Sequence, residues 1–247
     1  MTGVSTYRNP LSPPLVVKGR GPFPILLSIP HSGTDYPAWL VDLTRKGRQS
    51  LEPLEDPIVD RLAWRALELG VGAVIARAPR AAIDCNRSPG EIDVSVVAVA
   101  PDGDPGPRAR AGLGIIPGRT PQSGELWRRK ISQSEFFSRW SQAHVAYHEA
   151  VAAALAELRA VHPDVLLLDC HSMPPRSSEQ SQVVLGDRHG SSCASWLSDA
   201  ARAVVSRHGC SCTLNDPYAG GWIVERHGRP MSGVHALQVE LDRSLYL

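Results

Sequence analysis

Two histidines that each follow an apolar run are the residues of this chain with the clearest chemical potential. His171 lies in the segment Asp-Cys-His-Ser at 169–172, directly after the apolar run 165–168, and His31 lies shortly after the run 25–29. Short runs of Val, Ile and Leu bounded by polar residues predict buried strands. At neighbouring strand ends the two imidazoles could share one metal ion, as two of the three protein ligands of a catalytic zinc site.

The rest of the chain alternates between apolar runs and amphipathic stretches, and these elements must position the histidines. Further strands are predicted where Val- and Leu-rich runs are bounded by Gly, Pro or polar residues, at 71–75, 183–185 and 234–241. Helices are predicted from 57 onward, over 134–159 and over 194–208. Strands that alternate with helices indicate an α/β fold, with a parallel or mixed sheet covered on both faces.

Asp56 and Pro57 mark the start of the first predicted helix. Asp is favoured at the N-cap of a helix and Pro at its first helical position. This interpretation places Asp56 at the helix start and Asp60 one turn further along the same helix. A single Asp at such a position is usually a cap.

The longest predicted helix, 134–159, contains His144 and His148 one turn apart. This spacing can bind a metal, but no Glu lies between the two histidines in the His-Glu-x-x-His arrangement. His144 also falls within the apolar stripe that repeats every three to four residues. We therefore interpret it as a packed or hydrogen-bonded residue of the core.

The segment 102–124 is dense in Pro, Gly and Arg and shows no periodicity. Its length exceeds that of an ordinary connection between two elements. Long segments of this kind are often active-site lids, so we predict a lid or substrate loop.

The composition limits the kinds of binding partner and the cellular compartment that we expect for this chain. The chain has 247 residues, 43% of them hydrophobic, and a formal net charge of +1, which gives no support for nucleic-acid or membrane-surface binding. No apolar stretch approaches the length of a membrane span. The residues Met1–Ser5 lack the features of a signal peptide, and the five scattered cysteines show no Cys-x-x-Cys spacing. We expect a cytoplasmic protein with reduced thiols.

Five segments carry polar residues near the ends of predicted strands or at helix starts, and together they resemble one known family. They are Pro30–Gly33, Asp56–Asp60, Asp84–Arg87, Asp169–Pro174 and His235–Arg243. In this order they are similar to the N-formylglutamate amidohydrolase family, with further similarity at Val183–Arg188 and Tyr218–Trp222. That family is similar in fold to the zinc carboxypeptidases and aspartoacylases. The resemblance implies a three-layer α/β/α fold with a mixed, mostly parallel central sheet, formed as a single domain over 1–247.

The resemblance also implies a metal site that holds zinc or another divalent ion. His31 and His171 match the two imidazole ligands, and a carboxylate is expected as the third. Asp56 and Asp60 both match family positions, and we prefer Asp56. Carboxypeptidase-type sites have the carboxylate three residues after the first His, where this chain has Thr34.

Glu240 is implied as the general base and acid. It lies in the apolar run 236–241, and burial would raise the pKa of its carboxyl towards the range useful for proton transfer. The alternative is a Glu that pairs with Arg243 or another Arg at the sheet edge.

Substrate binding is implied for Arg87, with Asn86 beside it, because a guanidinium suits a bidentate hold on a carboxylate. N-formylglutamate carries two carboxylates, so a second basic group is expected. Arg80 fits a family position just upstream, and Arg119 and Arg226 are further candidates.

The function implied is metal-dependent hydrolysis of N-formyl-L-glutamate, or a similar N-acyl amino acid, to formate and L-glutamate, as in histidine degradation. Two alternatives remain: the same chemistry on another N-acyl acidic substrate, or a non-catalytic carboxylate-binding protein with the same fold. A serine hydrolase is disfavoured because the chain has no Gly-x-Ser-x-Gly motif.

Overall fold

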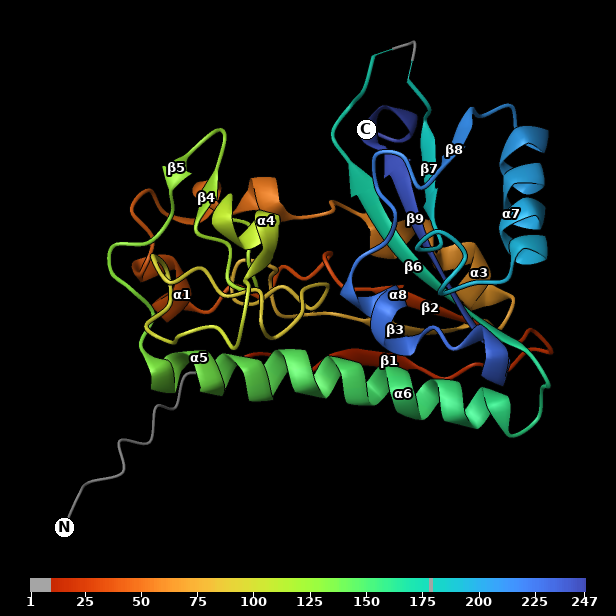
Figure 1. The fold of residues 1–247 in the computed structure, drawn as a ribbon, viewed down its shortest axis with the longest axis horizontal. Helices are drawn as coiled ribbons and strands as arrows, with labels where there is room; N and C mark the ends of the chain where they lie inside the picture. The colour runs from red at the N-terminus through yellow and green to blue at the C-terminus, as the bar shows by residue number, and fades with distance from the viewer. Residues whose placement is uncertain (1–9, 178–179) are drawn as a thin grey trace. The chain divides into compact units, whose positions relative to one another are not determined.

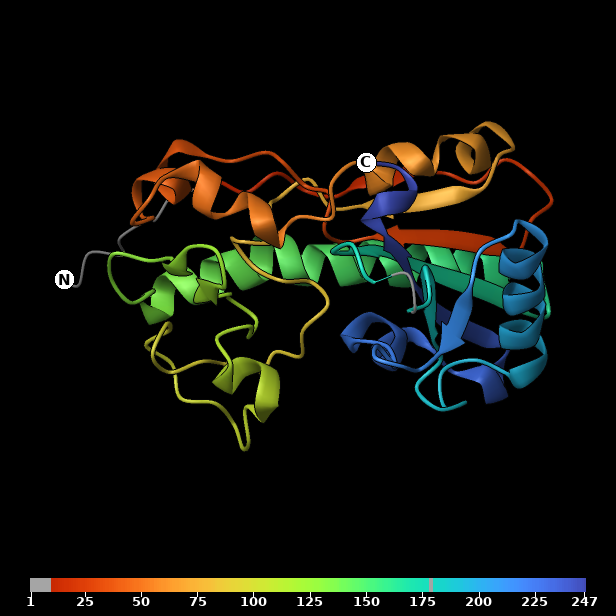
Figure 2. The ribbon, with the colours of Figure 1, turned by 90° about the horizontal axis from the view of Figure 1, so that it is seen from above.

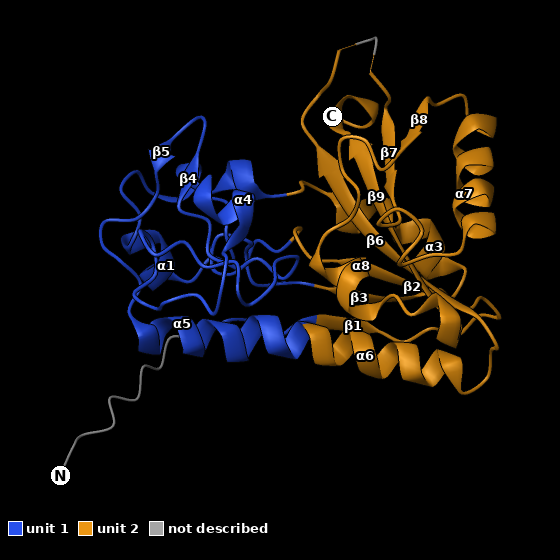
Figure 3. Ribbon diagram, viewed as in Figure 1, with its two compact units in different colours: residues 1–14, 33–55, 76–147 blue, residues 15–32, 56–75, 148–247 orange. Residues whose placement is uncertain are grey.

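The computed structural model describes residues 10–177 and 180–247, which form two compact units (Figure 3). The described part of unit 1 comprises residues 10–14, 33–55 and 76–147. Unit 2 comprises residues 15–32, 56–75 and 148–247, apart from 178 and 179. The prediction drawn from Met1–Ser5 lies outside the described residues. None of the helices in the described residues is long and apolar enough to cross a membrane.

Unit 2 is built on a seven-stranded sheet with the order β1-β3-β2-β6-β9-β7-β8 (Figure 1). The pairs β2–β3, β2–β6, β6–β9 and β7–β8 are parallel, and β1–β3 and β7–β9 are antiparallel. The mixed, mostly parallel sheet is therefore confirmed. The strands are β1 Leu15–Val17, β2 Ile25–Ile29, β3 Gly72–Ile75, β6 Val165–Met173, β7 Val183–Gly186, β8 Cys212–Leu214 and β9 Val234–Asp242.

Helices cover both faces of this sheet, which confirms the three-layer α/β/α fold (Figure 2). On one face, α3 (Trp64–Glu68) and α7 (Ser195–Arg207) pack their apolar side chains on the strands. The short helix α2 (Val59–Leu62) lies on the same face through Val59. On the other face, α6 (Ala146–Arg159) lies against β2, and α8 (Trp222–His227) contacts β6 and β9.

The predicted helix 134–159 forms as three consecutive helical segments. They are α5 (Gln133–Arg139), a π-helical stretch Trp140–Val145 and α6. A capping box between Ser132 and Glu135 starts the first segment. His144 is buried, and its Nε2 lies 2.9 Å from the backbone oxygen of Arg87, so the interpretation as a packed residue is confirmed.

Unit 1 has little regular structure besides α5. Its core is formed by buried aliphatic and aromatic side chains. Ile115 and Ile116 are buried in that core, so the segment 102–124 is anchored rather than a free loop. This segment includes the short helix α4 and most of a two-stranded hairpin. Bounds in unit 1 are α1 Ala38–Asp42, α4 Gly106–Arg110, β4 Arg119–Thr120 and β5 Gly124–Glu125, with 3-10 turns Arg48–Ser50 and Glu52–Leu54. Unit 2 adds 3-10 turns at Pro230–Ser232 and Arg243–Leu245.

Candidate metal centre and active site

Three buried side chains of unit 2 converge on one point: His31, Asp56 and His171. His31 Nδ1 and His171 Nδ1 lie 3.1 Å apart, and they lie 3.2 and 3.1 Å, respectively, from Asp56 Oδ2. Tetrahedral coordination at the bond lengths usual for zinc places neighbouring ligand atoms about 3.3 Å apart. Two imidazole nitrogens and a carboxylate oxygen are also the donors of hydrolytic zinc sites. The geometry and the chemistry of this group therefore fit a divalent metal ion.

The two histidines meet because their strands are parallel neighbours in register. Ser28 of β2 pairs with Asp169 of β6, and His31 and His171 follow these residues by three and two positions. β6 does not end at Leu168 as predicted but continues to Met173. The pairing of β6 with β2 ends at Asp169, whereas its pairing with β9 continues to Met173. His171 is thus held within a strand rather than in a loop.

Asp56 does not cap a helix, and the prediction that it shares a helix with Asp60 is wrong. The helix α2 begins only at Val59, after Ile58, whose backbone is left-handed with φ of 54°. The backbone N–H of Asp56 donates to the His31 carbonyl at 3.0 Å, so the two segments are tied together. The carboxylate therefore lies beside the histidines, while Asp60 lies in α2 outside the convergent group.

Further polar residues hold these side chains in place. His171 Nε2 donates to Asp169 Oδ2 at 2.9 Å, and Asp169 Oδ1 accepts from the Ser28 hydroxyl at 2.8 Å. In the neutral imidazole this contact places the proton on Nε2, so that the lone pair of Nδ1 can face His31 and Asp56. The other oxygen of Asp56, Oδ1, lies 3.5 Å from Arg243 Nη2. Sequence reasoning missed Ser28 and the contact of Arg243, because neither residue has an unusual local pattern.

The electrostatics of the group favour bound positive charge. Burial alone raises the pKa of the Asp56 carboxyl, but hydrogen bonds from His171 and His31 outweigh it and hold this pKa well below its usual range. Burial lowers the pKa of His171, but the charge of Asp169 outweighs this effect and raises it. A proton and a metal cation thus compete for the same lone pairs, as at other metal sites.

Glu240 lies on the strand next to His171 and on the same face of the sheet. β9 is parallel to β6, and Glu240 is the register partner of His171. Its side chain is half-buried, and Oε1 accepts a hydrogen bond of 2.9 Å from Gln238 Nε2. The negative charge of Glu240 contributes to the raised pKa of His171. A second carboxylate group thus stands next to the convergent group.

The candidate substrate-binding residues Arg80, Asn86 and Arg87 lie in unit 1. Arg87 is buried, and its Nε and Nη1 donate to the backbone oxygens of Leu113 and Asn86 at 3.0 and 2.9 Å. Within residues 10–177 and 180–247 its Nη2 donates no hydrogen bond, so this nitrogen is available for a carboxylate, while Nε also lies 3.7 Å from Glu91 Oε2. Burial lowers the pKa of Arg87 from its usual value.

Asp84 organises the same loop. Its Oδ1 accepts from the backbone N–H of Asn86 at 2.8 Å, and its Oδ2 accepts from Arg80 Nε at 2.8 Å. Arg119 and Arg226, the other arginines considered for a second carboxylate, are exposed on β4 and α8. Arg80 is therefore the more ordered of the candidates.

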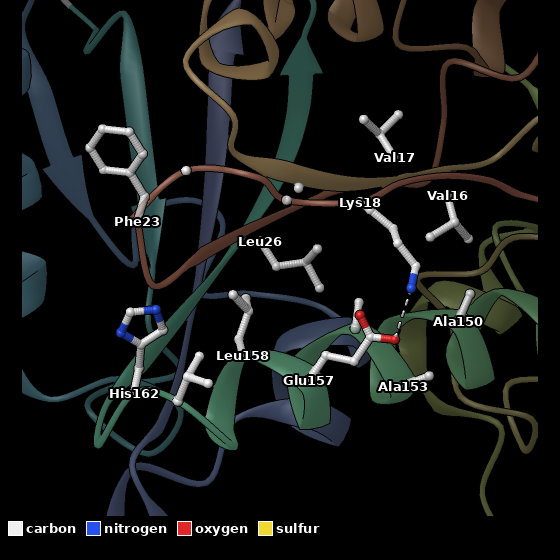
Figure 4. A pocket seen from close by; sticks show the side chains of 15 residues that line it. Val16, Val17, Lys18, Phe23, Leu26, Ala150, Ala153, Glu157, Leu158 and His162 are labelled. Atoms are coloured by element: carbon white, nitrogen blue, oxygen red, sulfur yellow. Dashed lines mark ion pairs between the residues drawn. The ribbon is translucent and has the colours of Figure 1, made fainter.

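Figure 4 shows a different kind of site, an apolar hollow of about 310 Å³ beside β1 and α6. Val16, Leu26 and Leu158 contribute apolar side chains, and an exposed ion pair of 3.6 Å joins Lys18 to Glu157. None of the convergent donors lines this hollow. Its lining is mostly apolar and contains no group of convergent metal-binding side chains among the described residues, so the metal centre remains the candidate active site.

Comparison with known proteins places this chain in a family. The sequence model of the N-formylglutamate amidohydrolase family matches residues 23–247. The chain belongs to this family. N-formylglutamate deformylases of Pseudomonas aeruginosa and Pseudomonas putida are 30% and 29% identical to it. Each alignment covers 92% of this chain, and the two cover 84% and 83% of those enzymes.

Solved structures show the same fold. The crystal structure of the N-formylglutamate amidohydrolase from Ralstonia eutropha matches with a TM-score of 0.87 and 28% identity, over 96% of this chain and 88% of that one. A gene product of Agrobacterium tumefaciens matches with a TM-score of 0.70 and 20% identity, over 95% and 85% of the two chains. The second likeness concerns the fold alone.

Proposed function

We propose that this protein hydrolyses the amide of N-formyl-L-glutamate to formate and L-glutamate, using a zinc or other divalent ion held by His31, Asp56 and His171. The buried convergence of these three donor atoms beside Glu240 is the observation that carries the proposal. Membership of the family and the deformylase names of its relatives support the choice of substrate.

The donor geometry supports the ligand assignment. His31 and His171 each present Nδ1, and Asp56 presents Oδ2, while Asp60 stands outside the group. When bound, the ion would polarise the formyl carbonyl and acidify a water molecule. Asp169 keeps Nε2 of His171 protonated and thereby keeps its Nδ1 available.

Glu240 is the proposed proton carrier. It accepts a proton from the water molecule as the water oxygen bonds to the formyl carbon. It then returns the proton to the amide nitrogen as the carbon–nitrogen bond breaks, so the amino acid leaves as an amine and the formyl group as formate. Positioned acid–base catalysis of this kind typically contributes about 10²- to 10⁴-fold.

Arg87 is the proposed partner of a substrate carboxylate, through the guanidinium edge that includes Nη2. Asn86 lies beside it, and Arg80 is proposed to contribute a second positive charge, oriented by Asp84. A substrate with two carboxylates matches two arginines. A reaction that yields L-glutamate fits a cytoplasmic step of histidine degradation, and we propose that setting for the enzyme.

The test is formate release by the purified protein from three substrates. We expect kcat/KM to be highest for N-formyl-L-glutamate, lower for N-formyl-L-methionine, which has no side-chain carboxylate, and lower for N-acetyl-L-glutamate, which has a bulkier acyl group and would release acetate. Equal values of kcat/KM for all three substrates would support a hydrolase but contradict the proposed preference for N-formyl-L-glutamate. No hydrolysis of any of them would favour a carboxylate-binding protein without catalysis.

A further inference from the structure

We infer that Gln238 is a positioning residue that sets the orientation of the Glu240 carboxylate. The inference rests on the proposed function, because the orientation of the Glu240 carboxylate matters only if Glu240 transfers the proton. Gln238 and Glu240 are two residues apart on β9, so their side chains lie on the same face of the sheet. Nothing in the sequence distinguishes Gln238 from an ordinary polar residue of a strand.

Gln238 is only 4% exposed, and both ends of its amide are engaged. Oε1 accepts a hydrogen bond from the backbone N–H of Gly221 at 2.8 Å, and Nε2 donates to Glu240 Oε1 at 2.9 Å. A backbone N–H can only donate, so it fixes which end of the amide is oxygen. A flipped amide would set two donors against each other at Gly221 and two acceptors against each other at Glu240. Gln238 therefore presents a donor, and never an acceptor, to the carboxylate of Glu240.

The anchor of this arrangement is itself held tightly. Gly221 is the residue before α8, and the preceding Ala219 and Gly220 lie directly against β7. A Cβ added at Gly186 of β7 would come within 2.6 Å of the Gly220 nitrogen, and the Ala219 carbonyl accepts from the Arg188 N–H at 2.7 Å. These contacts tie the loop to the sheet and so position the Gly221 N–H as a donor for Gln238.

The consequence for Glu240 is a restricted side chain. A half-buried Glu has several rotatable bonds, and proton transfer requires its oxygen to reach the water and then the leaving nitrogen. A hydrogen bond from a buried, anchored amide removes that freedom before substrate binds. Misplacement of a catalytic group by about 1 Å can cost about 100-fold in rate.

The experiment is a double-mutant cycle measured as formate release at saturating N-formyl-L-glutamate. Gln238→Met keeps the length of the side chain and removes both hydrogen bonds. We expect kcat to fall about 10- to 100-fold, with KM changed by less than about twofold and the metal content unchanged. Gln238→Glu can still accept a hydrogen bond from Gly221 but cannot donate one to an ionised Glu240. Its kcat should therefore fall at least as far, and the fall reports the loss of the donor alone.

The second arm repeats Gln238→Met in a Glu240→Gln background. If Gln238 acts only through Glu240, the residual kcat should change by less than about twofold, because neighbours that work as a unit are not additive. Gln142 provides a matched control in unit 1. Its Oε1 accepts from the Leu11 N–H at 3.0 Å and its Nε2 donates to Ser138 Oγ at 2.7 Å. Gln142→Met should leave kcat and KM unchanged.

The outcomes separate this inference from the proposed function. Equal losses of kcat in the two backgrounds, or a Gln238→Glu enzyme as fast as wild type, would overturn the role of Gln238 while the hydrolase stands. A wild-type protein that releases no formate would overturn the proposed function, and the role of Gln238 with it.

Discussion

At the scale of single residues, the centre is defined by groups that would be costly to bury without a cation. Three potential ligand atoms lie within hydrogen-bonding distance of one another, and the side chains of His31, Asp56 and His171 are almost entirely buried. Buried polar groups normally have complementary partners, and these three atoms can be paired either by protons on the imidazole nitrogens or by a bound cation. A metal ion at this point would satisfy all three atoms at once.

Glu240→Gln is expected to separate chemistry from binding. The change is nearly isosteric and removes the proton carrier, so kcat should fall by about 10²- to 10⁴-fold while KM and the bound metal stay close to wild type. Single-turnover formate release, with metal analysis of the same samples, checks this prediction. A change in kcat of less than about threefold would mean that Glu240 serves only structure.

Arg87→Lys is expected to weaken substrate binding although the positive charge is retained. A lysine cannot make the paired, planar hydrogen bonds of a guanidinium, and it cannot reproduce the donations to Leu113 and Asn86 that orient this side chain. KM for N-formyl-L-glutamate should rise by about tenfold or more. Arg119→Lys, at an exposed position, is the control. Equal KM values for the two variants would argue that Arg87 does not touch the substrate.

At the scale of elements, the centre depends on three parallel strands in register. His171 lies in β6, Glu240 lies in β9, and His31 follows β2 by two residues. All three are near the carboxyl ends of these strands. The apolar runs predicted these strands, with β2 exact and β9 correct to one residue. Periodicity could not show that β6 continues through Asp169 and His171, because that extension arises from pairing with β9 far along the chain.

The error at Asp56 has a similar origin. Local rules favour Asp as a helix cap before Pro57, and the sequence alone carries no sign of the competing attraction from two histidines in other segments. In the structure the carboxylate contacts His31 instead of capping a helix, and the helix begins only at Val59. Preference for Asp56 over Asp60 came from family resemblance, and the structure brings only Asp56 to the histidines.

Asp56→Asn and Asp60→Asn should therefore differ sharply. Asp56→Asn removes the negative oxygen next to both imidazoles, and we expect metal affinity to fall at least 100-fold, measured by competition with a chelator. Asp60→Asn, at a half-buried position of α2 outside the convergent group, should leave the affinity within about threefold of wild type. A larger loss for Asp60→Asn than for Asp56→Asn would reassign the third ligand.

At the scale of the whole molecule, the single domain over 1–247 remains a prediction. Contacts within the chain divide into two compact units, while the family model spans residues of both. Scanning calorimetry decides the matter. We expect one transition whose calorimetric and van't Hoff enthalpies agree, shifted to lower temperature by a chelator because a ligand of the folded state adds stability by mass action. Two separate transitions would show that the units unfold independently.

The measurement that tests the central claim most directly is metal analysis of the purified protein and of a His31→Ala, His171→Ala double variant, with formate release measured in parallel. We predict about one zinc-like ion per wild-type chain. The double variant should hold almost no metal and release no formate, while its circular dichroism stays that of a folded α/β protein. Full metal occupancy in the folded double variant would contradict the assignment of this centre.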